Sequence, residues 1–100
     1  MFFAYTFDFR KETQIRKKDM ILPRCNHVLE IDHDTVYVFG GESNGFDIDR
    51  CEKYDLKSDS WLEIASLPAA KFAITSTKDK NYIYISGIHD NEIYRFELEI

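Results

Sequence analysis

The sequence repeats itself at a constant spacing. Residues 81–87 (NYIYISG) align with residues 34–40 (DTVYVFG), so that Gly87 lies 47 residues after Gly40. Residues 4–8 (AYTFD) align with residues 51–55 (CEKYD) at the same spacing. A repeat period of about 20–50 residues indicates an array of structural units, each of which buries its apolar faces against its neighbours. The spacing therefore predicts a repeat protein.

Each repeating unit is predicted to be a series of short strands. Apolar and polar residues alternate with period two, and β-branched and aromatic residues dominate. The strands predicted for the middle unit are 27–31, 35–39, 49–56 and 60–64, separated by polar turns and a polar loop at 42–47. Four antiparallel strands with short connections form a meander, which is typical of one β-propeller blade. The predicted fold class is all-β, and the repeat register assigns residues 12–18 to a strand.

The repeat register divides the chain into three units. Residues 1–22 are predicted to be the second half of one unit, residues 23–68 a complete unit, and residues 69–100 a partial unit that lacks its last strand. This amounts to about two blades of an incomplete ring. Unclosed blades expose apolar faces and strand edges. We therefore expect self-association, or further blades in a longer parent chain, to cover them.

The middle unit resembles the kelch repeat family. The resemblance rests on two glycines that end a strand, on an aromatic pair that follows them, and on one glycine in the next unit: Gly40, Gly41, Tyr54, Trp61 and Gly87. Pro23-Arg24 also matches the usual entry to the first strand of a kelch unit. The resemblance implies four-stranded β-propeller blades and a protein–protein interaction module, either a scaffold or a substrate-recruiting protein.

The overall charge and the cysteines narrow the classes of partner. The net charge is −5, and an acidic chain without a basic stripe is a poor match for a phosphate backbone. No run approaches the roughly 18 apolar residues of a membrane span. Cys25 and Cys51 lack zinc-site spacing and are too few for a secreted disulfide scaffold, so they are typical of reduced cysteines. We expect a cytoplasmic protein that binds another protein, not nucleic acid or membrane.

Candidate binding residues come from the predicted loops. Loops on a rigid scaffold can vary without unfolding it, and they carry much of protein recognition. By the kelch resemblance, loops 21–25, 42–47, 69–72 and 89–91 gather on one face. The residues in or beside these loops that we expect to contact a partner are Arg24, Ser43, Asn44, Lys71 and Asn91.

An enzymatic role is the alternative hypothesis. By resemblance, the chain could instead be a fragment of a kelch-like propeller enzyme that acts on a sugar or as an oxidase. Its only polar candidates near the innermost strand are Arg24, His27 and Glu30, and a copper site needs His and Tyr ligands in a defined set. His33, between two aspartates, is predicted to be an exposed turn residue. We therefore predict no catalytic residues, no metal and no cofactor.

Overall fold

The regular structure of the protein is entirely β-strand wherever it is described. The computed structural model describes residues 4–8, 13–70, 75–87 and 92–98. Their strands are β1 (Ala4–Asp8), β2 (Thr13–Lys17), β3 (Val28–Asp32), β4 (Thr35–Phe39), β5 (Glu42–Ser43), β6 (Phe46–Asp47), β7 (Cys51–Asp55), β8 (Ser60–Ile64), β9 (Thr75–Lys78), β10 (Tyr82–Ser86) and β11 (Ile93–Glu97). The all-β fold class predicted from the alternation is confirmed. Within these ranges, no helix has the length and apolar character that crossing a membrane requires.

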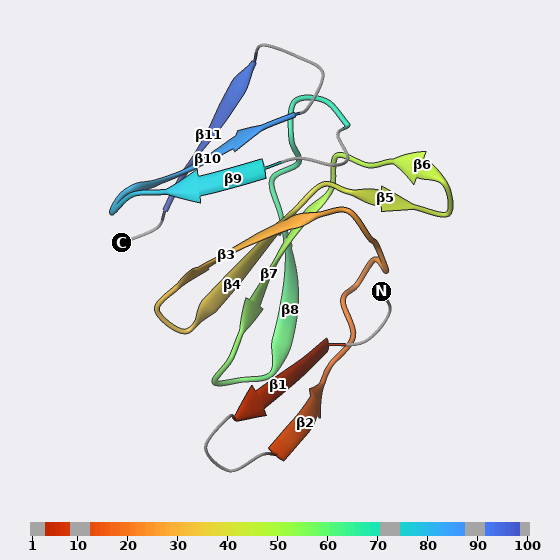
Figure 1. Ribbon diagram of the computed structural model, residues 1–100, viewed down its shortest axis with the longest axis vertical. Coiled ribbons are helices and arrows are strands. Elements are labelled where there is room, and N and C mark those ends of the chain that lie inside the picture. Colours follow the sequence, from red (N-terminus) through yellow and green to blue (C-terminus); the bar gives the residue numbers. More distant parts are fainter. Residues whose placement is uncertain (1–3, 9–12, 71–74, 88–91, 99–100) are drawn as a thin grey trace.

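The middle of the chain forms a four-stranded antiparallel meander, the middle sheet. Its strand order is β3-β4-β7-β8, which follows the order of the chain, and the β5–β6 hairpin lies between β4 and β7 in the sequence (Figure 1). The tight turns between β3 and β4 and between β7 and β8 each contain a non-glycine residue with positive φ, His33 (53°) and Asp59 (51°). Short polar side chains tolerate this conformation better than others. His33 is exposed in its turn, as the sequence predicted.

The flanking sheets follow the same register as the middle sheet. β9, β10 and β11 form a three-stranded sheet in the order β11-β10-β9, and β1 pairs with β2. Phe7 pairs with Gln14 across β1 and β2, 47 residues before the pair formed by Tyr54 and Trp61 across β7 and β8. The structure therefore carries the sequence repeat into strand pairing.

The core lies between the middle sheet and the β9–β11 sheet. Tyr37 and Phe39 alternate along β4 and so face the same side. Their ring centroids lie 5.5 Å and 5.4 Å from that of Phe96 on β11. Ile83 and Ile85 on β10 complete this core and are almost fully buried. Burial of this apolar surface is what holds the two sheets together.

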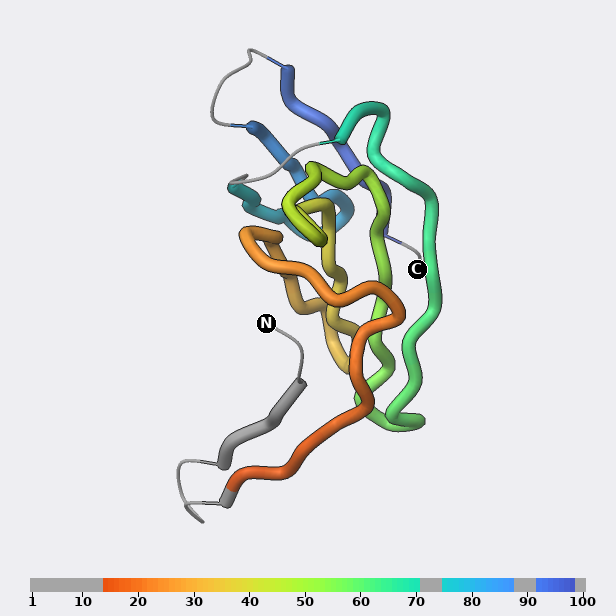
Figure 2. The backbone as a smooth tube through the Cα atoms, turned by 90° about the vertical axis from the view of Figure 1, so that its right-hand side faces the viewer, coloured from red at the N-terminus to blue at the C-terminus, as the bar shows by residue number. Residues whose placement is uncertain are grey.

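The opposite face of the middle sheet is covered only in part. The segment between β2 and β3 runs along the middle sheet (Figure 2). The Lys18 carbonyl of this segment accepts a 2.7 Å hydrogen bond from the Trp61 indole N–H on β8. On the same face, Leu29 and Ile31 of the edge strand β3 remain about half exposed. Apolar side chains thus stay accessible on this face, as expected for an incomplete ring.

Candidate functional site

Two segments far apart in the sequence meet at one end of the middle sheet. We call this the loop end and define it as residues 21–27, which enter β3, together with residues 40–50, which connect β4 to β7. Cys25 and Glu42 form an isolated antiparallel β-bridge. The Cys25 N–H donates to the Glu42 carbonyl at 3.0 Å, and the Glu42 N–H donates to the Cys25 carbonyl at 2.9 Å. The Ser43 hydroxyl donates a 2.7 Å hydrogen bond to the Pro23 carbonyl. The two segments are thereby fastened to each other.

Residues 42–47 form a small hairpin of β5 and β6, although the sequence predicted only a polar loop. Its turn is Asn44-Gly45, with φ of 53° and 82°. Two consecutive residues with positive φ fit the twist of a two-residue hairpin, and Asn-Gly is the sequence best suited to it. At the base of the hairpin, Gly41 has φ of 100°, and a Cβ there would lie 2.6 Å from the Cys25 carbonyl oxygen. Glycine is therefore required by both conformation and space.

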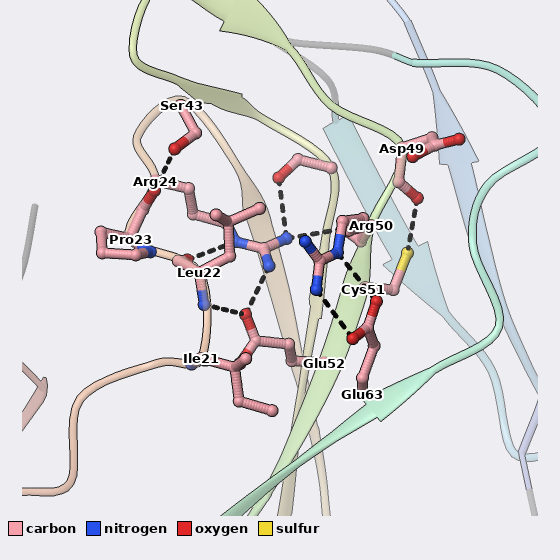
Figure 3. Close-up of polar contacts among 11 residues, drawn as sticks. Ile21, Leu22, Pro23, Arg24, Ser43, Asp49, Arg50, Cys51, Glu52 and Glu63 are labelled. Carbon is pink, nitrogen blue, oxygen red and sulfur yellow. Dashed lines mark hydrogen bonds and ion pairs between the residues drawn. The ribbon is translucent and has the colours of Figure 1, made fainter.

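Arg24 lies beneath the loop end and not on its surface. Its guanidinium is fully buried and pairs with Glu52 on β7, with an N–O distance of 2.5 Å (Figure 3). The same guanidinium donates to the backbone carbonyls of Leu22 (3.2 Å), Gly40 (3.1 Å) and Arg50 (2.6 Å). Arg24 thus ties together the entry to β3, the end of β4 and the start of β7.

Glu52, which lies on β7 beneath the loop end, completes this network. Its carboxylate also accepts hydrogen bonds from the backbone N–H groups of Ile21 (2.7 Å) and Leu22 (3.1 Å). A buried ion pair offsets its desolvation only when the remaining hydrogen-bonding groups are satisfied. Backbone groups supply those partners here, so the network can act as a rigid support for the exposed loop residues above it.

His27 is the one described side chain in this region with an unmatched buried atom. Its Nδ1 is buried without a hydrogen-bond partner. Burial lowers the pKa of the imidazole, and the nearby Arg24 guanidinium lowers it further. A neutral histidine beside a buried cation fits packing better than proton transfer.

The two thiols are not activated for nucleophilic chemistry. The Cys25 thiol lies 3.4 Å from the Glu42 carboxylate, which raises the pKa of the thiol. Burial raises the pKa of the Cys51 thiol as well. Reactive cysteines need the opposite shift, toward the thiolate. Among the residues that the structure describes, no three His, Cys, Asp or Glu side chains are placed to hold a metal ion.

The predicted partner-contacting residues occupy different environments. Asn44 is exposed at the hairpin tip, and Ser43 is half-buried beside it. Arg24 lies close to both in the fold, but its burial leaves no guanidinium surface for a partner. Lys71 and Asn91 lie outside the described residues. Their roles as contacts therefore stay predictions.

The aromatic motif residues pack within the sheet. The rings of Tyr54 and Trp61 face each other across β7 and β8, with centroids 4.9 Å apart. Burial and a hydrogen bond to Asp59 raise the pKa of Tyr54 to about 12. Gly40 also has positive φ, 58°, and Gly87 directly follows β10. None of these positions is a surface platform for a ligand.

Sequence reasoning missed Glu52 and Phe46. Glu52 lies in β7 (Cys51–Asp55) together with the charged residues Lys53 and Asp55, so its charge alone gave no signal of burial, and only the strand pairing places it opposite the buried Val38. Phe46 was counted within a polar loop, yet it is the most exposed of the large hydrophobic residues noted in the described chain, at 74%. A lone phenylalanine in a polar hairpin was the available signal.

Comparison with known families agrees with this geometry. A model described as the kelch motif matches residues 23–68, which span the middle sheet and the loop end. The chain belongs to the kelch repeat family. Its antiparallel sheets, packed face to face at a constant register, are the blades of an incomplete kelch-type propeller.

Several curated kelch proteins are similar to this chain. Kelch-like protein 36 of Rattus norvegicus is 30% identical over 89% of the chain, and beta-scruin of Limulus polyphemus is 30% identical over 82%. Kelch repeat and BTB domain-containing protein 2 of cowpox virus (strain GRI-90 / Grishak) is 31% identical over 84% of the chain. The chain spans only 14%, 10% and 15% of these three relatives, respectively.

Proposed function

We propose that this kelch chain is a non-catalytic protein–protein interaction module that contacts its partner through the loop end. The observation that carries the proposal is the division of the loop end into two layers. The buried Arg24–Glu52 network forms the lower layer, and the exposed hairpin with Asn44 at its tip forms the upper layer. A rigid support under exposed loops is the arrangement that favours recognition of another molecule.

The relationship to kelch proteins supports a protein as the partner class. Kelch repeats are protein-interaction modules, and the relatives carry the kelch name or are scruins. The acidic net charge of −5 also favours a protein over a nucleic acid. We propose a scaffolding or substrate-recruiting role, in which the kelch surface holds another protein in place.

The proposal can be tested with a phage-displayed library of folded protein domains, selected on the immobilised chain. We expect enriched domains whose binding weakens when Asn44 is replaced by glycine together with Ser43 by alanine, because glycine keeps the positive φ of the turn. Lys80→Ala, in the exposed turn between β9 and β10, is the matched control and should bind normally. Enriched domains that bind both variants equally would rule out Ser43 and Asn44 as partner contacts.

A further inference from the structure

The β5–β6 hairpin displays a large apolar side chain at its tip. Phe46 lies directly after the Asn44-Gly45 turn and is 74% exposed. It pairs across the hairpin with Ser43, whose hydroxyl is tied back to the Pro23 carbonyl. The hairpin strand that carries Phe46 is therefore fixed in place while the Phe46 side chain stays largely exposed.

The connection that carries the hairpin is longer than the corresponding connection in the next unit. Eleven residues, 40–50, separate β4 from β7, whereas six residues, 87–92, separate the corresponding strands β10 and β11. The middle sheet does not need the extra five residues to close its strands, because the shorter connection also joins paired strands. The hairpin that carries Phe46 is thus not required for strand pairing.

Several contacts hold the hairpin in one conformation. The Cys25–Glu42 bridge and the hydrogen bond from the Ile48 N–H to the Gly41 carbonyl (3.0 Å) fasten its base. The Glu42 carboxylate also accepts a 3.0 Å hydrogen bond from the Asn26 side chain. A partner would meet a surface that is already ordered, which reduces the entropy lost on binding.

The charges around Phe46 indicate the chemistry of the partner. Residues 42–49 contain Glu42, Asp47 and Asp49 but no lysine or arginine, and Asp47 and Asp49 are exposed. Arg50, the next residue, is engaged with Glu63 at 2.8 Å. A hydrophobic contact bordered by carboxylates is complementary to apolar side chains flanked by cations.

We propose that Phe46 is the anchor of a binding surface for a basic, apolar segment of a partner protein. Leucine-like or aromatic side chains of that segment pack on the Phe46 ring, and its lysines or arginines face Asp47 and Asp49. This inference rests on the proposed protein-binding function and specifies the surface and the kind of segment that it takes.

The test uses a phage-displayed library of random 12-residue peptides, selected on the whole 100-residue chain. We expect enriched peptides to combine large apolar residues with lysine or arginine. Phe46→Ala should weaken their binding at least about tenfold, as loss of a central aromatic anchor does. Asp47→Asn should weaken it less and should reduce its dependence on salt.

The matched control is Leu62→Ala on β8, where the side chain is 58% exposed but lies away from the hairpin. It should bind the peptides as the parent chain does. Both substitutions remove exposed side chains, so circular dichroism should show unchanged folding. Enriched peptides that keep their affinity for Phe46→Ala would overturn the anchor but leave a protein-binding function in place. A selection that enriches no peptide while the domain library still yields binders at the loop end would also overturn it, and failure of both libraries would overturn the proposed function as well.

Discussion

The middle sheet and the β9–β11 sheet share one strand register but fill the same position in different ways. Val38 pairs with Glu52 in the middle sheet, and Ile85, 47 residues after Val38, pairs with Tyr94 in the other. Glu52 meets the buried Arg24, whereas Tyr94 packs against the apolar core. Beside Tyr94 lies a cavity of about 380 Å³. Backbone pairing can therefore be kept while the chemistry beneath the loops changes.

The difference shows what the ion pair contributes. Tyr94 stands in the β9–β11 sheet where Glu52 stands in the middle sheet, so a carboxylate at this position is not a requirement of strand pairing. In the middle sheet the network fastens backbone groups of Ile21, Leu22, Gly40 and Arg50. These are the segments that carry the longer, hairpin-bearing connection. We infer that the network's role is to order the loop end.

The largest effect should follow from breaking this network. Arg24→Ala leaves the Glu52 carboxylate buried without its cation, and we expect a loss of about 3–5 kcal/mol in the free energy of unfolding. Urea unfolding followed by circular dichroism measures it. Arg50→Ala is the control, because it breaks an ion pair with Glu63 whose side chains are each 42% exposed, and it should destabilise the chain far less than Arg24→Ala. Equal losses would contradict a special role for the buried pair.

The second-largest loss of stability should come from a substitution at Gly41, where the backbone lies close to the Cys25 carbonyl. Gly41→Ala places a Cβ against the Cys25 carbonyl at φ of 100°, and we expect a loss of about 2–4 kcal/mol in the free energy of unfolding. Gly45→Ala is the matched variant, because its φ is 82° but the space around it is open. It should cost only about 1–2 kcal/mol, the conformational part alone. Thermal unfolding of the two variants measures the comparison. Equal losses of stability would mean that the close contact with Cys25 adds no cost beyond the unfavourable φ.

The smallest effect should come from imposing the middle-sheet residue on the other sheet. Tyr94→Glu places a carboxylate in a partly buried, apolar position beside the cavity, and we expect a loss of about 1–3 kcal/mol. Tyr94→Phe keeps the ring and should cost less. Midpoints of thermal unfolding measure both variants. A glutamate variant as stable as the parent chain would mean that the two positions are interchangeable, and the comparison between the sheets would fail.

Much of the architecture was predictable because it depends on local pattern. Alternation of apolar and polar residues specifies which face of a strand is buried, and the 47-residue spacing specifies which strands are equivalent. Asn44 and Gly45 lie in the polar loop predicted at 42–47, and both have positive φ in the structure. The hairpin between β5 and β6 was not predicted, because two strands of two residues each leave almost no periodic signal.

The candidate site was less predictable for a physical reason. Arg24 stands in a segment expected to be a surface loop, and nothing local shows that a carboxylate 28 residues later reaches it. Glu52 is likewise buried only because the segment between β2 and β3 folds back over β7. Burial of a charge depends on where its partner comes to lie in three dimensions.

The sequence by itself determined the kelch relationship, the all-β class and the strand register, because each follows from residues close together in a repeating pattern. Tertiary structure alone decided that Arg24 is buried beneath the loop end and that Phe46 is exposed on it. Those outcomes depend on contacts between distant segments, Cys25 with Glu42 and Arg24 with Glu52, which form only when the sheet is assembled.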